Sequence, residues 1–212
     1  MRSSGTLNRI TCQPRRKGVS APKEGRVLFE ESGDETGFIY AGMYLSAFAP
    51  HRTGRELIGG PLNLYNDLHH FAEFHSGLFF KQRIEAISDR ALEDYLRAYN
   101  IGAIVAFHPQ SVQRLLALRD RVRLDRRIGP FHLMRVEQPL TWLLEGEGRV
   151  QSFLGGIRVE EARGESLVLK YHWSPRLVAD PPARVEPFPI LADPIPFIRV
   201  VDPPAAFTLR LR

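Results

Sequence analysis

The C-terminal part of the sequence constrains the fold most strongly, because it combines many prolines with short apolar runs. Residues 167–175 lead from an apolar stretch into an aromatic-rich corner, and a proline-rich tail follows. In that tail, β-branched and aromatic residues gather at 197–201 and 207–209, between prolines that are typical of turns, edges and strand starts. The pattern predicts that the chain closes on a folded β-unit and not on a disordered end.

The same kind of pattern extends back to about residue 138. We expect short strands at 149–153, 156–159, 166–171, 183–186, 196–201 and 206–211, a spacing typical of β-sandwiches. Helical signals are absent from this stretch. We therefore predict that residues 138–212 form an all-β, sandwich-like subdomain.

Residues 25–137 show a mixed pattern that indicates an α/β subdomain. We expect a strand at 26–30, a turn at 32–35, a short buried helix within 38–49, and a loop at 53–61 with a brief strand at 57–58. Ser88 is the expected N-cap of a helix at 90–99.

A strand at 101–107, buried on both faces, a helix at 110–119 and strands at 121–124 and 131–136 complete this part. The order predicts a three-layer α/β unit with some parallel pairing. The expected fold class is thus α/β (α+β), with the all-β module at the C-terminal end.

Composition supports a folded chain. Of the 212 residues, 43% are hydrophobic and 10% aromatic, enough to bury a sizeable core. The single cysteine, Cys12, excludes an intramolecular disulfide. The weakly polar run at 38–49 is too short to cross a bilayer, which takes roughly 20 residues. No apolar segment follows the N-terminal basic residues, so we expect neither a signal peptide nor a membrane span in this sequence.

The net charge of +5 lies in the N-terminal stretch. Residues 1–25 hold six basic residues and one acidic residue, Glu24, so the remaining 23 basic and 23 acidic residues balance. A folded nucleic-acid reader normally carries its basic surface on the globular part. We therefore expect residues 1–24 to be a disordered basic arm, and we expect no nucleic-acid partner.

A histidine cluster is the most chemical-looking pattern. If residues 69–75 were helical, His69 and Glu73 would share a face at a spacing that suits two metal ligands, while His70 and His75 would not complete it. A polar rim over phenylalanines is the competing interpretation, and we predict no metal ligands and no cofactor.

Catalytic motifs are absent from the sequence. It has no nucleophile elbow and no phosphate-binding glycine loop, and residues 54–60 are expected to be an ordinary loop. The acidic pairs at 30–31, 145–147 and 160–161 are interpreted as solvated charge. We predict no catalytic residue.

Several segments together resemble the soluble C-terminal region of bacterial polytopic membrane proteins of the GT-C glycosyltransferase type. The resemblance lies in residues 25–30, 53–60, 96–101, 129–131, 171–175 and 193–198, and it spans roughly residues 25–212. Such proteins transfer sugars from lipid-linked donors on the extracytoplasmic side, with catalytic carboxylates on loops between membrane helices that this sequence lacks.

The resemblance implies a non-catalytic accessory domain that helps position a glycan or acceptor, at the extracytoplasmic face of the bacterial inner membrane. Its partners would be a glycan or lipid-linked sugar, and the membrane through a transmembrane part outside this sequence. The chain would then be a fragment or a free-standing homologue of the domain.

The candidate substrate-binding residues are Arg55, Tyr171, His172 and Trp173. Tyrosine and tryptophan at a strand end can offer flat apolar faces to a sugar ring, with the histidine as a hydrogen-bond donor. The competing interpretation of residues 171–173 is packing at a corner of the β-module.

Two alternatives from other classes remain open. One is a small soluble metal-dependent enzyme that uses His69, His70, Glu73 and His75. The other is a stand-alone carbohydrate-binding module with Trp173 on its surface.

Overall fold

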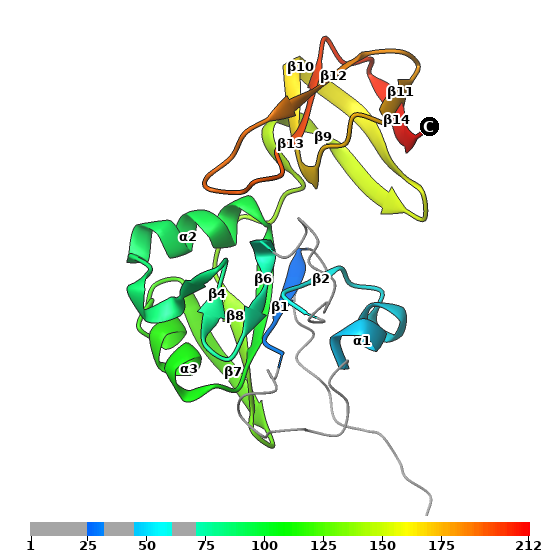
Figure 1. The fold of residues 1–212 in the computed structure, drawn as a ribbon. Coiled ribbons are helices and arrows are strands. Elements are labelled where there is room, and N and C mark those ends of the chain that lie inside the picture. The colour runs from blue at the N-terminus through cyan, green and yellow to red at the C-terminus, as the bar shows by residue number, and fades with distance from the viewer. Residues whose placement is uncertain (1–24, 32–44, 61–70) are drawn as a thin grey trace, which may run out of the picture.

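The computed structural model describes residues 25–31, 45–60 and 71–212, and these form a mixed α+β structure that is mostly sheet. Three sheets are present in this part of the chain, with five, six and three strands. The five-stranded sheet and its helices lie at one end of the molecule, and the six-stranded sheet lies at the other end (Figure 1). The expected turn at 32–35, the basic arm 1–24 and residues 38–44 of the expected helix fall outside the described residues.

The five-stranded sheet has the order β2-β1-β6-β8-β7. Its strands are β1 (Arg26–Phe29), β2 (Leu57–Ile58), β6 (Ile101–Ala106), β7 (Val122–Ile128) and β8 (Phe131–Val136). Strand β1 pairs in parallel with β2 and β6, whereas β8 runs antiparallel to both β6 and β7. The expected strands and the expected parallel pairing are therefore confirmed, and the three-layer arrangement stays a prediction.

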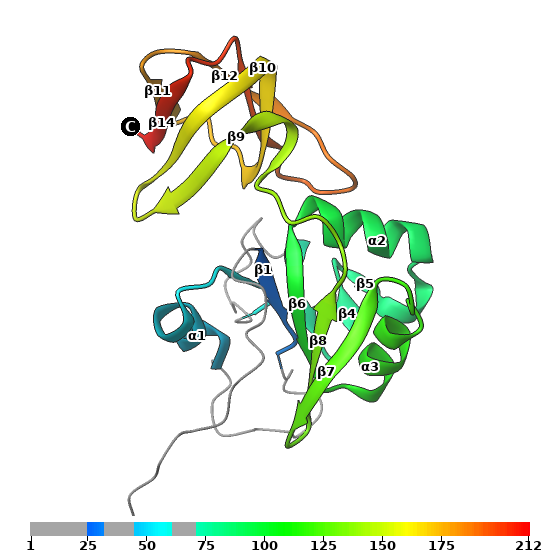
Figure 2. The ribbon, with the colours of Figure 1, turned by 180° about the vertical axis from the view of Figure 1, so that it is seen from behind.

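Three α-helices accompany this sheet, α1 (Leu45–Thr53), α2 (Asp89–Ala98) and α3 (Pro109–Leu116), together with the 3-10 helix η3 (Ile84–Ala86). Both views place α2 and α3 on one side of the sheet and α1 beyond β2 on the other (Figures 1 and 2). The Ser88 hydroxyl accepts a hydrogen bond from the Ala91 N–H, as expected of an N-cap. Leu92, Tyr95 and Leu96 recur at helical spacing, so α2 buries one apolar face.

A small sheet of β3 (Phe74–His75), β4 (Leu78–Phe79) and β5 (Gln82–Arg83) has no counterpart in the sequence-based expectations. Its two-residue strands are too short to give a periodic signal. Its phenylalanines pack against α2, where the Phe80 ring stacks on Tyr95 with centroids 4.3 Å apart. Aromatic packing, and not strand propensity, explains why this segment folds.

The six-stranded sheet is antiparallel throughout. It consists of β9 (Leu143–Phe153), β10 (Gly156–His172), β11 (Leu177–Asp180), β12 (Arg184–Phe188), β13 (Phe197–Val201) and β14 (Ala206–Leu211). The first half of β10 pairs with β14 and the second half with β13, while β9 follows both halves. The edge strands β11 and β12 come into contact, so the sheet nearly closes into a barrel.

The expected strands at 156–159 and 166–171 are one strand of 17 residues, so their separation was wrong. Glu161 and Gly164 have φ angles of 56° and 113°, which bend β10 without ending it. A sequence pattern cannot distinguish such a bend from a turn, because both interrupt the alternation of apolar residues. The expected all-β character of this module is confirmed, and its six strands form one nearly barrel-like sheet.

The hydrophobic core connects the two sheets. Its larger cluster lies mainly around the five-stranded sheet but includes Val168 from β10 and Phe197 from β13. A second cluster fills the barrel-like sheet and includes Leu167 and Leu169. Successive residues of β10 thus enter different clusters, as the alternation of side chains along a strand requires. The division into subdomains 25–137 and 138–212 stays a prediction.

Candidate functional site

The structure brings two of the four predicted binding residues, Tyr171 and His172, to the contact between the two sheets. Tyr171 and His172 end β10, and Trp173 follows directly. Trp173 is half-buried and packs against the core of the barrel-like sheet, in line with the packing interpretation. Arg55 precedes β2, and its guanidinium donates a hydrogen bond to the Gly25 carbonyl (3.1 Å). Burial lowers the pKa of Arg55.

Arg26, which the sequence analysis did not single out, is the centre of this contact. It is the first residue of β1 and is buried. Its Nε donates to a Glu56 carboxylate oxygen at 2.9 Å. The two terminal nitrogens donate to the main-chain carbonyls of Tyr99 (3.1 Å) and Lys170 (2.9 Å). One guanidinium therefore joins β1, the end of α2 and β10.

Two aromatic rings cover the same guanidinium. The Trp142 and Tyr171 rings are stacked, with centroids 5.4 Å apart, and the Arg26 Cζ lies 4.9 Å and 4.8 Å from them. The Tyr171 hydroxyl donates to Glu56 at 2.8 Å, and the Ser152 hydroxyl donates to the same carboxylate oxygen at 2.5 Å. Burial and the Glu56 charge raise the pKa of Tyr171, which stays protonated as a donor.

A second polar group lies beside it. His172 Nε2 is 2.7 Å from an Asp193 carboxylate oxygen, and the Tyr99 hydroxyl donates to that same oxygen. Burial by itself would raise the pKa of Asp193, but the hydrogen bonds from His172, Tyr99 and the Ile195 N–H outweigh it, so that the pKa is lowered. Asp193 is thus an ionised carboxylate that holds His172 in place.

These residues surround an interface pocket of about 240 Å³. Arg26, Tyr99, Lys170, Tyr171 and His172 line it together with apolar side chains such as Phe197. Most of their polar atoms already have partners within the protein, so the pocket is a structural contact more than an open binding site. We call this contact the Arg26 joint, and it comprises Arg26, Glu56, Trp142, Lys170 and Tyr171. Its contacts explain why Tyr171 and His172 lie at the pocket, and they do not require a ligand.

Lys170 is the one strongly perturbed cation of this joint among the described residues. Its side chain is buried, and Nζ donates to the Arg97 carbonyl at 2.8 Å. Burial first, and then the charges of Arg26 and Arg97, lower the pKa of Lys170 to about 8. The charged lysine therefore costs stability below that pH.

We expect the stability of the protein to rise with pH because of Lys170. Below about pH 8 the lysine is charged in both the folded and the unfolded chain, so the full destabilisation caused by burying its charge is present. Above that pH the folded chain releases the proton first, which adds about 2 kcal/mol to the free energy of unfolding between about pH 7.5 and about pH 9.5. Urea unfolding followed across this range should show the rise in wild type and in Lys81→Met, and not in Lys170→Met. Equal pH slopes in wild type and Lys170→Met would contradict this assignment.

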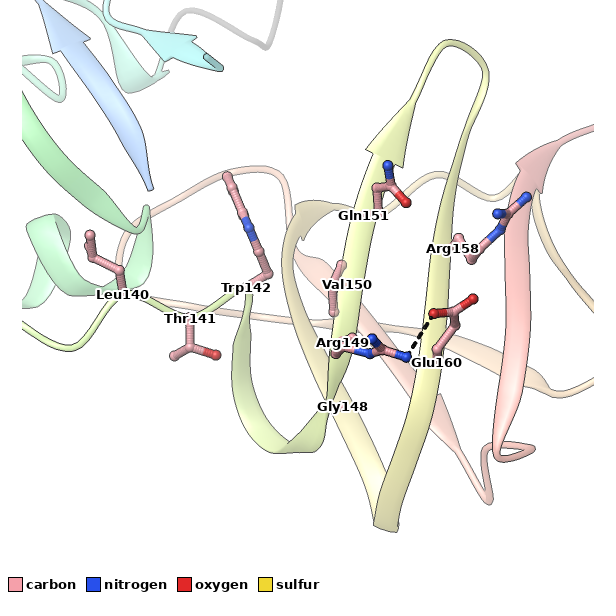
Figure 3. A pocket seen from close by; sticks show the side chains of 9 residues that line it. All are labelled: Leu140, Thr141, Trp142, Gly148, Arg149, Val150, Gln151, Arg158 and Glu160. Carbon is pink, nitrogen blue, oxygen red and sulfur yellow. Dashed lines mark ion pairs between the residues drawn. The ribbon is translucent and has the colours of Figure 1, made fainter. Parts of the chain in front are cut away.

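A second, larger pocket is an open groove on β9 and β10, with a volume of about 460 Å³ (Figure 3). We call it the β9–β10 groove. It is lined by Leu140, Thr141, Trp142, Gly148, Arg149, Val150, Gln151, Arg158 and Glu160. Trp142 reaches it from the segment that leads into β9, so one indole ring borders both the groove and the Arg26 joint.

Strand register explains why the polar side chains of the groove gather. Gln151 pairs with Arg158, and Arg149 pairs with Glu160. Residues two apart on a strand share a face, and so do directly opposed partners, so these four side chains lie on one face of the hairpin. Arg149 forms ion pairs with Glu160 (3.3 Å) and Glu161 (3.0 Å). Gln151 and Arg158 are exposed.

The histidine cluster lies partly outside the described residues, since His69 and His70 are not among them. Glu73 lies directly before β3, in which Phe74 and His75 form a strand, so the described end of residues 69–75 is not the helix that a shared His69–Glu73 face requires. The Glu73 carboxylate is 3.0 Å from Lys81 Nζ and 3.6 Å from His75 Nε2. Within the described ranges no group of three or more His, Cys, Asp or Glu side chains is placed to hold a metal ion.

One sequence-based interpretation was wrong. Glu30 and Glu31, taken as solvated charge, are 0% and 3% exposed. Glu30 follows β1 directly and accepts hydrogen bonds from the N–H groups of Phe107 and His108 (both 3.0 Å), at the start of α3. The Ser111 hydroxyl (2.5 Å) and the Gly77 N–H (3.1 Å) complete its shell. Burial raises the pKa of Glu30, and these four donors partly offset the effect.

Comparison with known proteins finds no matching family model, no matching curated protein and no matching solved structure. Among the helices that the structure describes, none combines the length and the apolar composition needed to cross a bilayer.

Proposed function

We propose that this chain is a non-catalytic accessory domain of a membrane glycosyltransferase-like protein of the GT-C type, and that its β9–β10 groove helps position a glycan or acceptor. In this proposal the α/β unit supports the joint around Arg26, and the β-rich unit presents the groove. The observation that carries the proposal is the groove itself, with an indole ring and a set of exposed polar side chains on one face.

The composition of the groove suits a sugar. Carbohydrates present flat C–H faces and rings of hydroxyl groups, so they bind where an aromatic ring lies beside hydrogen-bond donors and acceptors. Trp142 is half-exposed, Gln151 offers both a donor and an acceptor, and Arg158 offers several donors. The Arg149–Glu160 ion pair adds a charged rim. The volume of about 460 Å³ lies within the usual range of small-ligand pockets.

The structure also favours the groove over the predicted residues as the contact surface. The Tyr171 hydroxyl and the His172 ring are engaged by Glu56 and Asp193, and Trp173 packs against the barrel core. We therefore assign Tyr171 and His172 to holding the two sheets together beside the groove. The stand-alone carbohydrate-binding module remains an alternative that would use the same groove.

The proposal is tested by glycan binding to the 212-residue protein. A panel of neutral and acidic oligosaccharides is screened on an array, and the strongest binder is titrated by NMR. We expect binding in wild type and at least about tenfold weaker binding in the double variant Gln151→Ala and Arg158→Ala, because hydrogen bonds to the sugar are lost.

The matched control removes the same two residue types elsewhere, in Gln113→Ala and Arg123→Ala. Both side chains are exposed, on α3 and β7. This variant should bind like wild type. Absence of binding to every glycan, or equal affinity of wild type and the groove variant, would count against the proposal.

A further inference from the structure

The turn between β9 and β10 exposes apolar side chains that no part of the described protein covers. Leu154 is fully exposed, and Phe153 is 43% exposed. Leu211, near the end of β14, is 58% exposed. Isolated exposed leucines are common, whereas three large apolar residues at one end of a module indicate a contact surface.

Strand register places these residues at the same end of the barrel-like sheet. Gly156 pairs with Phe153 on one side and with Arg210 on the other, and Leu211 follows Arg210. Figures 1 and 2 show the β9–β10 hairpin end and the end of β14 on the same side of the barrel-like sheet. We call this end of the sheet the hairpin tip: Leu154 and Phe153 lie at the turn, and Leu211 lies at the margin, on the opposite face of the sheet from Phe153.

The turn itself is tight. Only Leu154 and Gly155 lie between the paired residues Phe153 and Gly156, and Gly155 has a φ of 89°. The Phe153 ring packs directly on the Gly156 backbone. If Gly156 had a Cβ, this atom would lie only 2.7 Å from the ring. Leu154 lies at the apex of this two-residue turn, where its side chain is exposed.

Basic residues outnumber acidic residues around the hairpin tip. Segments 149–159, 174–179 and 207–212 contain five arginines, and the acidic residues that pair with these segments are Glu160, opposite Arg149, and Asp180, opposite Thr208. Arg149 is paired with Glu160 and Glu161. The other four are Arg158, Arg176, Arg210 and Arg212, and all are exposed. In the described part of the chain none of these four forms an ion pair with a carboxylate side chain, and the Arg176 guanidinium donates to the Arg212 main-chain oxygen (2.8 Å from Nε).

We propose that the hairpin tip docks on an anionic lipid bilayer, with Leu154 and Phe153 inserted into the interfacial layer and the four arginines at the headgroups. Apolar side chains surrounded by basic residues are the combination that binds such a surface. A second copy of the chain fits less well, because two hairpin tips would bring their arginines together. This inference does not depend on glycan binding in the β9–β10 groove.

Vesicle sedimentation tests the docking with the full chain. The vesicles are phosphatidylcholine alone or phosphatidylcholine with about one third phosphatidylglycerol. We expect binding to the anionic vesicles, weakening as salt is added, and little binding to the neutral ones. Leu154→Asp should reduce the partition coefficient by about tenfold or more, because it removes the apical apolar group and adds a negative charge.

Three further variants sharpen the result. Leu191→Asp makes the same change at another exposed leucine, which is 48% exposed in the loop between β12 and β13, and should bind like wild type. Arg210→Glu should lower the affinity and weaken its dependence on salt. Gln151→Ala, a groove change without a charge change, should bind vesicles normally, so failure of the glycan proposal would be distinguishable.

Three outcomes would overturn the inference. The first is that wild type binds neither kind of vesicle. The second is that Leu154→Asp and Leu191→Asp bind anionic vesicles equally well. The third is that wild type self-associates in size-exclusion chromatography and Leu154→Asp does not, which would assign the hairpin tip to a contact between copies.

Discussion

Replacing Arg26 with methionine is expected to lower the free energy of unfolding by about 3–5 kcal/mol, the largest effect among the substitutions considered. The change removes the partner of the part-buried Glu56 carboxylate. It also leaves the carbonyls of Tyr99 and Lys170 without the donors they have in wild type. Buried polar groups that lose their partners cost more than the hydrogen bonds contributed. Urea unfolding followed by circular dichroism measures the difference.

Two further variants show whether the geometry of the guanidinium matters. Arg26→Lys keeps the charge but has no planar group to lie against Trp142 and Tyr171 while donating in three directions, so we expect an intermediate loss. Arg123→Met removes an exposed arginine from β7 and should change stability by less than about 0.5 kcal/mol. A similar small change for Arg26→Met would show that the joint does not hold the sheets together.

Glu30→Ala is expected to lower the free energy of unfolding by about 3 kcal/mol or more. The substitution deprives the Phe107, His108 and Gly77 N–H groups of their acceptor at the carboxyl end of β1. Each buried donor left unsatisfied costs about 1–3 kcal/mol. Because two of these donors lie at the start of α3, loss of the carboxylate also removes the tie between β1 and that helix. The measurement is again urea unfolding.

Glu30→Gln separates the acceptor atoms from the charge. The glutamine amide keeps one acceptor oxygen, but its NH2 group takes the place of the other oxygen and faces hydrogen-bond donors. We therefore expect a smaller loss in the free energy of unfolding than for alanine. Glu85→Ala, at an exposed position of η3, is the control and should be close to neutral. A Glu30→Ala protein as stable as the control would contradict the buried-acceptor role.

The sequence predicted the secondary structure of the five-stranded sheet well, because its signals are local. Ser88 at the start of α2 and the apolar run of β6 are legible without knowledge of the fold. The small sheet around Phe74 and the unbroken course of β10 were missed. The strands of the small sheet are too short to give a periodic signal, and the bend in β10 interrupts the pattern of apolar residues in the same way as a turn.

The candidate site was predicted less well, for a related reason. The aromatic-rich corner at Tyr171 drew attention to the joint, but its central residue, Arg26, resembles any arginine at the start of a strand. Glu30 was misjudged because an acidic pair after a strand resembles solvated charge unless its donors are known. The groove depends on the register of β9 and β10, and a pairing register between strands of this length is not fixed by the sequence pattern alone.

The alternation of side chains along β10 has a mechanical consequence. Val168 and Lys170 extend into the α/β side of the molecule, while Leu167 and Leu169 extend into the barrel-like sheet. Strand β10 is therefore held on both of its faces near its C-terminal end, and the hairpin turn lies at its N-terminal end, beyond the bend at Glu161 and Gly164. Displacing β10 at Lys170 would disturb both hydrophobic clusters and the hydrogen bond to the Arg97 carbonyl at the same time, so neither sheet can shift without the other.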